Sequence, residues 1–227
     1  MLRLTAERVC VLIPAYNEAA KIGAVIRQVQ EQGFRVLVSD DGSFDETAVI
    51  AESLGANVLR AKKNEGKGAS IRKGLREFLK TDLLAVILMD SDGQHDPADL
   101  CAFLGALETG ADLVIGNRMG RPEGMSRIRR LTNRVMSGVL SRLARQRIPD
   151  SQCGYRAMTR EAARALALRS DRFEVESEMI LEASRLGFKI FSVPVRCIYA
   201  DETSHIRPAQ DTLRFFYFIF RYFKSRT

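Results

Sequence analysis

Two aspartates separated by a single residue, Asp90 and Asp92, follow a run of seven apolar residues, Leu83 to Met89. Alternate acids in a loop just past a buried strand can both point into one crevice. There their oxygens suit a hard divalent cation, with a diphosphate completing its coordination. Gln94 adds a neutral oxygen to this set. Acid pairs also occur as helix caps or solvated turns, so the position directly after an apolar strand is what favours a metal site.

Two further polar clusters have the residue types of a nucleotide site. Residues 40–47 place several acids after a second apolar run, where a carboxylate such as Asp41 can bind base or ribose hydroxyls. Ser43 or Asp45 could instead cap the following helix. Residues 64–68, with Lys67 between two glycines, resemble a phosphate loop but lack the spacing of an NTPase P-loop. No G-x-G-x-x-G motif follows a strand, which disfavours the usual type of NAD or FAD site.

Hydrophobic periodicity predicts the elements that hold these clusters. Continuous apolar runs predict buried strands, and apolar positions at helical spacing predict helices between them. Strands are expected at 9–13, 34–38, 57–59, 83–89 and 112–115, with helices at 18–32, 44–54, 68–79 and 97–107. This alternation predicts an α/β protein with a mostly parallel sheet and helices on both faces. Because ligands of such sheets bind at the carboxyl ends of strands, the polar clusters should meet in one crevice.

Beyond Gly116 the alternation ends, and helices are expected at 128–147, 161–168 and 174–186, with a strand at 189–198. No long linker interrupts the chain, so residues 1–210 are predicted to form a single domain. Four well-separated cysteines indicate a reduced, cytoplasmic protein without structural zinc. No segment reaches the roughly 18 apolar residues that a membrane-spanning helix needs.

Residues 211–227 are predicted to form an amphipathic helix rich in aromatic and basic side chains. Aromatic rings interspersed with cations suit the headgroup boundary of a bilayer, which predicts a peripheral protein on the inner, cytoplasmic face of the membrane. The same helix could instead pack on the core, in a homo-oligomer interface or against a membrane protein.

The 227 residues carry a net charge of +7, from 35 Lys and Arg against 28 Asp and Glu. The excess lies in one segment, because Arg118 to Arg156 contains ten arginines and two acids. The planar fork of arginine suits phosphate oxygens. A nucleic-acid surface is one interpretation, but no known nucleic-acid motif is present, and acids at the strand ends would repel a polyanion. The segment therefore favours a smaller phosphate-bearing ligand over nucleic acid.

The polar clusters, in chain order, resemble those of the family 2 glycosyltransferases of GT-A fold: Pro14-x-Tyr16-Asn17-Glu18, Asp40-Asp41-Gly42-Ser43-x-Asp45-x-Thr47, Asn64-x-Gly66-Lys67-Gly68 and Asp90-x-Asp92-x-Gln94-His95-x-Pro97. Three later motifs are similar to those of the dolichyl- or polyprenyl-phosphate sugar synthases, such as the mannose synthases: Gly116-x-Arg118, Asp150-x-x-Cys153-Gly154-Tyr155-Arg156 and Val193-Pro194-Val195. Each motif is weak alone, but the ordered set is specific.

This resemblance implies a hexosyltransferase whose catalytic residues are Asp90, Asp92 and Arg118, with Mg²⁺ or Mn²⁺ held by Asp90, Asp92 and Gln94. It implies a nucleotide-sugar donor, GDP-mannose or a UDP-sugar, bound by residues at the strand ends: Pro14, Tyr16, Glu18, Asp41, Lys67 and Ser91. The phosphate of a polyprenyl phosphate acceptor is expected at Arg118, Arg130, Arg156, Ser204 and His205. Family members often carry Ser-Lys where this chain has Ser204-His205.

The acceptor class has independent physical support. Inverting transfer to a hydroxyl needs a general base, often in a Glu-Asp pair, and the chain has no Glu-Asp dipeptide. A phosphate monoester, with a second pKa near 6, is already an anionic nucleophile at pH 7 and needs no base. We therefore expect inverting transfer of mannose or glucose to polyprenyl phosphate. The alternatives are a transferase acting on a hydroxyl in polysaccharide, glycolipid or cell-wall synthesis, a non-catalytic donor-binding module and, more remotely, a nucleic-acid-binding protein.

Overall fold

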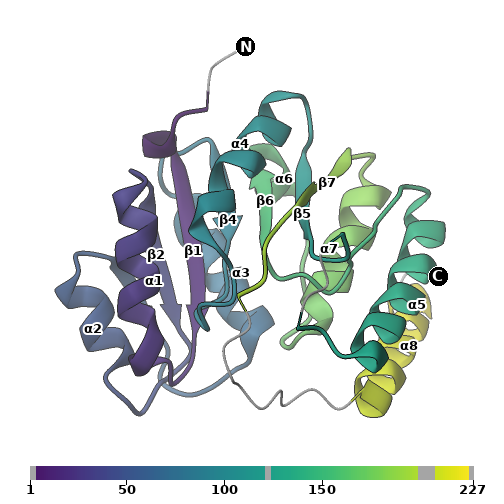
Figure 1. Cartoon of the computed structure of the whole chain (residues 1–227), viewed down its shortest axis with the longest axis horizontal. Helices are drawn as coiled ribbons and strands as arrows, with labels where there is room; N and C mark the ends of the chain where they lie inside the picture. Colours follow the sequence, from purple (N-terminus) through teal and green to yellow (C-terminus); the bar gives the residue numbers. More distant parts are fainter. Residues whose placement is uncertain (1–3, 121–123, 199–207, 225–227) are drawn as a thin grey trace.

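The computed structural model describes residues 4–120, 124–198 and 208–224, the last range without the side chains of 208–211. Its centre is a seven-stranded sheet in the order β3-β2-β1-β4-β6-β5-β7 (Figure 1). The strands are β1 (Val9–Ala15), β2 (Arg35–Asp40), β3 (Asn57–Arg60), β4 (Ala85–Leu88), β5 (Leu113–Asn117), β6 (Arg156–Thr159) and β7 (Ile190–Pro194). The helices are η1 (Ala6–Arg8), α1 (Ala19–Glu31), α2 (Thr47–Ser53), α3 (Lys67–Phe78), η2 (Pro97–Asp99), α4 (Leu100–Glu108), α5 (Arg127–Ala144), α6 (Arg160–Ala165), α7 (Glu174–Arg185) and α8 (Pro208–Lys224).

The predicted mostly parallel sheet is confirmed. Every side chain of β1 and β4 is buried, as the continuous apolar runs required for strands covered on both faces. The predicted boundaries shift by a few residues: β1 continues through Pro14 to Ala15, and β4 ends at Leu88. The predicted strand at 189–198 is regular only as far as Pro194.

One strand, β6, runs antiparallel to both of its neighbours and was not predicted. Its first residue, Arg156, lies opposite Leu88 near the end of β4 and opposite Ile115 of β5. The segment that leads into β6 therefore enters the sheet at the edge where β4 and β5 finish. This antiparallel insertion brings residues 150–155 into the crevice formed by the other strand ends.

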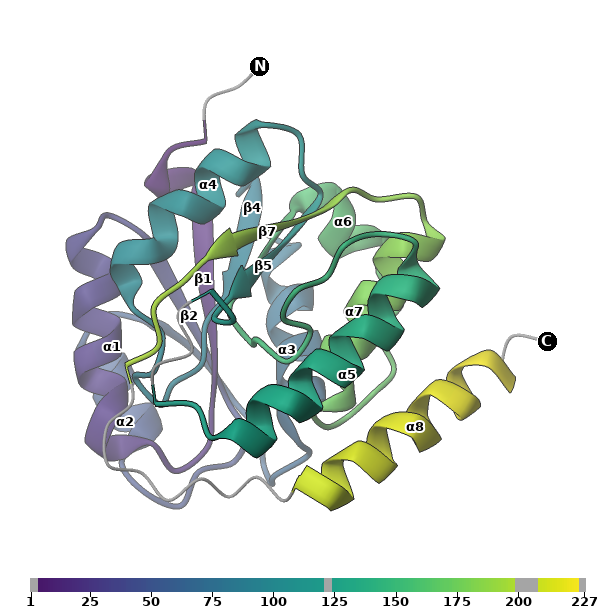
Figure 2. The same ribbon diagram turned by 45° about the vertical axis from the view of Figure 1, so that its right-hand side comes forward.

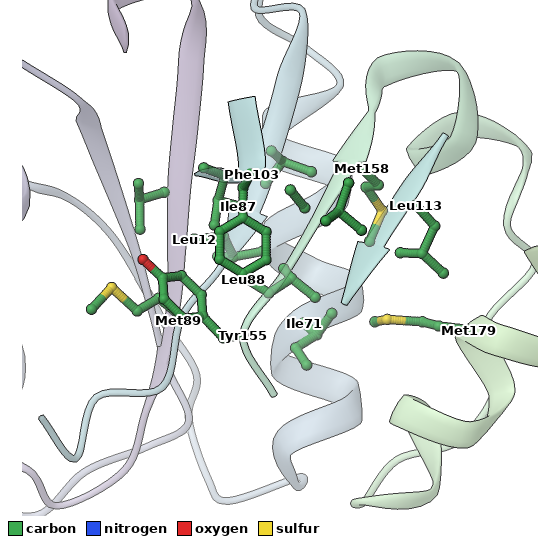
Figure 3. Packing of buried hydrophobic residues seen from close by; sticks show 14 of the residues in the cluster. Leu12, Ile71, Ile87, Leu88, Met89, Phe103, Leu113, Tyr155, Met158 and Met179 are labelled. Atoms are coloured by element: carbon green, nitrogen blue, oxygen red, sulfur yellow. The ribbon is translucent and has the colours of Figure 1, made fainter. Parts of the chain in front are cut away.

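Helices cover both faces of the sheet, with α1 and α4 on one face and α3 and α6 on the other (Figures 1 and 2). The helix α3 packs closely on β1, because a Cβ at Gly74 would lie 2.3 Å from Cδ1 of Leu12. Figure 3 shows the side chains of Ile71, Ile87 and Phe103, from α3, β4 and α4, gathered in the core. This packing fixes the strand ends that carry the polar clusters.

At the β7 end of the sheet, α5, α7 and α8 pack against one another (Figure 2). The last helix begins at Pro208, three residues before the predicted segment, and its Phe215 and Tyr222 are buried. The Tyr222 hydroxyl donates a 2.6 Å hydrogen bond to the buried Glu182 of α7. The other side of α8 exposes Leu213, Phe216, Tyr217, Phe220 and Phe223. Among the described helices, none has the length and apolar character to cross a bilayer.

Candidate active site

The loops after β1 and β2 are joined by hydrogen bonds from short polar side chains. Asn17 lies in the left-handed region with φ 55°, its N–H donates to Ser43 Oγ, and its Oδ1 accepts from the N–H of Phe44. Asp45 accepts from the N–H of Thr47, the first residue of α2, and from that of Ala19, the first residue of α1. The N-cap residue of α2 is Glu46 and makes no side-chain cap bond, so neither Ser43 nor Asp45 is the N-cap. Asp45 nevertheless binds the first N–H of α2 and so ties the starts of two helices together.

Asp41 holds the loop that follows β3. Its two carboxylate oxygens accept from the backbone N–H groups of Glu65, at 3.0 Å, and Gly66, at 2.7 Å. Two further N–H groups, those of Gly68 and Ala69, donate to the carbonyl of Asp171. These four backbone donors are taken by protein acceptors and are not presented to a phosphate. The resemblance to a phosphate loop does not extend to its geometry.

Lys67 links the first aspartate of the D-x-D motif to a second acid. Its Nζ lies 2.7 Å from Asp90 Oδ1 and 2.9 Å from Glu176 Oε1. Burial alone would raise the pKa of Asp90, but Lys67, together with His95 and Arg118, lowers that pKa to about 2. Burial would likewise lower the pKa of Lys67, yet the two carboxylates raise it. Lys67 and Asp90 therefore form an ion pair, and the carboxylate of Glu176 is the second partner of the ammonium.

Gly154 comes from the segment that precedes β6 and lies directly over this ion pair. A Cβ at this position would be 2.5 Å from Asp90 Oδ2 and 2.9 Å from Lys67 Nζ. Only glycine leaves room for the ion pair in its present place. The Asp90–Lys67 pair is therefore confined by the β6 lead-in on one side and by α7, which carries Glu176, on another.

The rest of the D-x-D loop is held by local contacts. Asp92 Oδ1 accepts from the N–H of Gln94, and the carbonyl of Gln94 accepts from Ile198 just beyond β7. His95 is buried, its Nδ1 accepts from the N–H of Asp90, and its ring stacks on Tyr155. These contacts give His95 a structural role within the loop. Ser91, a predicted donor contact, is also buried.

Arg118 is fixed at the end of β5 by a buried acid. Its Nε and Nη2 reach the two oxygens of Asp150 at 2.8 and 3.0 Å, and its own N–H also donates to Asp150. Asn133 of α5 donates to the same carboxylate at 2.7 Å. Burial would raise the pKa of Asp150, but the bonds from Arg118 and Asn133 hold it below its ordinary value. Because β4 and β5 run in the same direction, Arg118 and Asp90 lie at the same edge of the sheet.

The other predicted acceptor residues differ in position. Arg156 is completely buried, and its guanidinium donates to the backbone carbonyls of Ser151, Cys153 and Glu176. These bonds hold the β6 lead-in, so the predicted contact of Arg156 with acceptor phosphate does not fit the structure. Arg130 is exposed on the first turns of α5, where it can meet a ligand. The predicted Ser204 and His205 lie outside the described residues.

The predicted donor residues at the end of β1 approach the D-x-D loop. Pro14 is buried at the second-last position of β1. Tyr16, just beyond the strand, is exposed and contacts the ring of Phe44 edge-on. Glu18 is half-buried. Burial is the main cause that raises its pKa, and the nearby carboxylates of Asp92 and Asp90 reinforce the shift. Glu18 and the D-x-D loop follow the neighbouring parallel strands β1 and β4, so they lie at the same edge of the sheet.

Comparison with known proteins decides the family. Residues 10–167 match the model of glycosyl transferase family 2, which is well over half of the chain. The chain is a family 2 glycosyltransferase. Glycosyltransferase AglJ of Haloferax volcanii is 37% identical over 193 residues, which cover 84% of this chain but only 63% of AglJ. Polyprenol monophosphomannose synthase of Mycolicibacterium smegmatis is 31% identical over 204 residues, covering 83% of this chain and 77% of that protein.

Solved structures confirm the GT-A fold of this family 2 glycosyltransferase. Mannosyl-3-phosphoglycerate synthase of Rubrobacter xylanophilus has a TM-score of 0.71 at 21% identity, covering 96% of this chain and 73% of that one. Glucosyl-3-phosphoglycerate synthase of Mycobacterium tuberculosis, solved with Mn²⁺, UDP and glucosyl-3-phosphoglycerate, has a TM-score of 0.66 at 24% identity, covering 86% of this chain and 72% of that one.

The donor set of the glycosyltransferase fits a hard divalent cation that takes further ligands from its substrate. Within the described ranges, no three acidic, His or Cys side chains gather closely enough to hold an ion by themselves. The carboxylate of Asp92 and the amide oxygen of Gln94 are oxygen ligands on one short loop, beside the anionic Asp90. One or two carboxylates completed by phosphate oxygens are typical of Mg²⁺ sites in proteins.

Three residues that shape the glycosyltransferase crevice were missed in the sequence. Glu176 lies on a helix far along the chain, and Asn133 lies within the arginine-rich helix, where neither has a neighbouring motif. Asp150 is the first residue of the motif at 150–156, but its sequence context did not predict that it binds an arginine. A buried acid near a fixed arginine is only recognisable once the antiparallel β6 is known, because β6 brings residues 150–155 next to β5.

Proposed function

We propose that this glycosyltransferase moves a hexose, mannose or glucose, with inversion from a nucleotide sugar to a polyprenyl phosphate at the cytoplasmic face of a membrane. The observation that carries the proposal is the pairing of charges across the crevice. Acids from the β4 loop face the side where a donor diphosphate and its cation would bind, and Arg118 at the end of β5 supplies a fixed guanidinium at the same edge. Two phosphate groups could thus be held next to each other.

Two acids of the site, Asp90 and Asp150, are poor candidates for a general base. Asp90 is an ion-paired carboxylate with a pKa of about 2, and Asp150 is bound to Arg118 with its pKa held below the ordinary value. A carboxylate with so low a pKa accepts a proton weakly at pH 7. An acceptor that is already anionic, such as a phosphate monoester, removes the need for proton abstraction.

Each residue of the proposed site then has a definite task. Arg118 would bind the acceptor phosphate and orient one of its oxygens toward the anomeric carbon, and the exposed Arg130 would bind the same group from α5. Asp92 and Gln94, with Asp90, would hold Mg²⁺ or Mn²⁺. When bound, that ion supplies Lewis-acid stabilisation of the departing nucleoside diphosphate. Tyr16, Glu18 and Asp41 would border the nucleotide.

The location of the reaction is supported by α8. Its exposed side combines large apolar residues with Arg221 and Lys224 in its last turn. Such a surface suits the headgroup region of a bilayer, where a polyprenyl phosphate presents its phosphate. Relatives of this chain are named polyprenol monophosphomannose synthase and undecaprenyl-phosphate mannosyltransferase, and these names support a polyprenyl phosphate as the acceptor.

The decisive experiment compares two acceptors that differ only in the phosphate. The protein is incubated with GDP-mannose, UDP-glucose and UDP-N-acetylglucosamine in turn, with Mg²⁺ or Mn²⁺, and with either polyprenyl phosphate or the matching polyprenol. We expect transfer from one donor to polyprenyl phosphate and at least 100-fold less transfer to the polyprenol. Equal transfer to the free alcohol would refute the proposed acceptor and favour a hydroxyl-directed glycosyltransferase.

A further inference from the structure

A basic depression of about 720 Å³ lies on the outer edge of the sheet, beside the edge strand β3 and the helix α3. No role in the proposed reaction involves it. Six cationic side chains line it, against two acids, Glu65 and Glu77. The cations are Arg60, Lys62, Lys63, Lys73, Arg76 and Lys80. We call it the β3–α3 pocket.

Half of the cations of the β3–α3 pocket are neutralised by neighbouring acids. Arg60 pairs with Glu52 at 2.6 Å, Lys80 with Glu77 at 2.6 Å, and Lys73 with Glu65 at 3.0 Å. The other three are Lys62, Lys63 and Arg76, which have no ion-pair partner among the described residues. Three unpaired cations around one depression produce a local positive potential that attracts a multiply charged anion.

The wall formed by residues 61–66 is a fixed loop. The N–H of Ala61 donates to the carbonyl of Asp40 at 2.9 Å. Gly42, with φ +77°, lies against the backbone of Lys63, where an added Cβ would be 2.7 Å from its carbonyl carbon. The backbone positions of Lys62 and Lys63 are therefore set by the strand ends of the sheet, which pre-organises part of the β3–α3 pocket.

Glu65 connects the β3–α3 pocket to the crevice. Its carboxylate pairs with Lys73 in the pocket, while its backbone N–H donates to Asp41, a predicted donor contact. An anion that binds Lys73 would compete with Glu65 for this ammonium. Losing that ion pair would free the Glu65 side chain and weaken the hold of the loop on Asp41.

We propose that the β3–α3 pocket binds a phosphate-bearing anion, and that its occupancy weakens donor binding in the crevice through Glu65. The second half rests on the proposed function. The ligand class is a diphosphate or another multiply charged phosphate, since arginine and lysine together recognise phosphate oxygens. Such a group could belong to a free metabolite or to an anionic lipid headgroup.

Binding is tested by isothermal titration calorimetry, in which inorganic diphosphate is titrated into the full chain in the presence of EDTA. The pocket variant is Lys62→Ala with Arg76→Ala, which removes two unpaired cations. The matched control is Arg164→Ala with Lys189→Ala, because both of these residues are exposed and lie outside the pocket. We expect the pocket variant to raise the dissociation constant at least tenfold and the control to change it less than twofold. Equal changes in both variants, or no binding to the unmodified chain, would overturn the proposal.

Coupling is tested with UDP or GDP, whichever binds. Saturating diphosphate should raise the nucleotide dissociation constant at least threefold in the unmodified chain and leave it unchanged in the pocket variant. An effect that persists in the pocket variant is direct competition in the crevice and refutes the coupling. If neither nucleotide binds, the proposed function fails, whereas the diphosphate titration still decides whether the pocket is a site.

The source of the anion is separated with vesicles. Pelleting with phosphatidic acid vesicles is compared with pelleting with phosphatidylcholine vesicles. Loss of pelleting in the pocket variant, but not in the control, identifies a lipid headgroup as the source. Pocket-dependent diphosphate binding, with equal pelleting of both variants, identifies a free phosphate compound. A pocket variant that matches the control in both assays contradicts the site.

Discussion

The two sides of the crevice carry fixed charges of opposite sign. On the side of β1, β2 and β4 the predicted ligand-binding groups are acids, and Asp41 and Asp90 are held by backbone N–H groups and by Lys67. On the side of β5 the group is a cation, Arg118, held by the fully buried Asp150. On each side a charged group is thus fixed by an oppositely charged residue from elsewhere in the chain: Asp90 by Lys67, and Arg118 by Asp150. The proposed reaction needs this difference, because it brings a cation-bound diphosphate next to an anionic acceptor.

The two sides meet at the segment that leads into β6. Asp150 at its start holds Arg118, and Gly154 near its end lies against Asp90 and Lys67. The guanidinium of Arg156 holds the segment in place by donating hydrogen bonds to three backbone carbonyls. A single stretch of seven residues, 150–156, therefore sets the position of the acidic side relative to the cationic side.

The largest effect is expected on the acidic side. Asp92→Ala removes a proposed metal ligand that has no ion pair to any described residue, so the fold should be little affected. We expect transfer to fall about 1,000-fold, which is about 4 kcal/mol of transition-state stabilisation. The rate is measured with the preferred donor at saturating Mn²⁺ or Mg²⁺.

The control for this change is Asp82→Ala, which removes an equally charged, exposed acid near the other end of β4. Its rate should stay within twofold of the unmodified enzyme. If Asp92→Ala retains more than a tenth of the activity, or if EDTA leaves the rate unchanged, the acidic side does not serve as a cation site.

On the cationic side, Asp150→Asn should destabilise the protein by about 3 kcal/mol, because it leaves a buried guanidinium without its counter-charge. The pKa of Asp150 is held below its ordinary value of 3.8 in the folded protein. Its stabilising effect is therefore fully present above pH 3.8 and is lost as the pH falls through the folded-state pKa.

Urea unfolding at a series of pH values checks this. The stability difference between the unmodified protein and Asp150→Asn should be largest at pH 6 to 8 and should shrink below pH 4. A difference that is constant with pH would show that the carboxylate charge is not what fixes Arg118.

Arg118→Lys keeps the positive charge but loses the planar guanidinium, so it should raise the acceptor KM more than it lowers kcat.

The junction between the two sides is tested by Gly154→Ala. The new methyl group would lie 2.5 Å from Asp90 Oδ2, so the Asp90–Lys67 pair must move. We expect about a tenfold loss of transfer, which corresponds to about 1.4 kcal/mol, together with weaker Mn²⁺ binding by calorimetry. Gly138→Ala in α5 is the matched control, because an added Cβ there meets nothing within 4 Å. Equal activities of the two variants would show that the junction does not constrain the metal ligands.

The acidic side was largely predictable from sequence because local pattern and topology agree there. Each cluster follows a strand whose apolar run is continuous, and parallel strands end at one edge, so Asp41 and Asp90 could be placed together without any contact information. What pattern alone could not show is the partner of each group. Lys67 resembled part of a phosphate loop, yet its ammonium is bound by Asp90 and by Glu176, which is 109 residues away.

The cationic side was less predictable for a topological reason. The strand β6 has only four residues and begins with an arginine, so it gives no hydrophobic run to detect. Its antiparallel direction places residues 150–155 at the crevice, and this decides which arginines are available. The family resemblance implied that both Arg118 and Arg156 contact the acceptor phosphate, and both are buried. They differ in their partners: the guanidinium of Arg156 donates to three backbone carbonyls, whereas that of Arg118 is held by the carboxylate of Asp150. The residue type predicted affinity for phosphate, but only the packing around each guanidinium shows whether a phosphate can reach it.

The smallest effect on transfer is expected at α8, and this change tests whether the helix belongs to the scaffold of the cationic side. Tyr222→Phe removes the 2.6 Å hydrogen bond to the buried Glu182 of α7 and keeps the ring. A hydrogen bond to a charged group contributes about 1.5 kcal/mol, so urea unfolding should show a loss of this size. Tyr217→Phe is the control, since its ring is 63% exposed and the change should stay within about 0.5 kcal/mol. Because neither tyrosine has a role in the proposed site, transfer at 25 °C should be unchanged in both variants. If Tyr222→Phe matches Tyr217→Phe in stability, α8 is not anchored through this residue, and its exposed apolar side would have to account for its position.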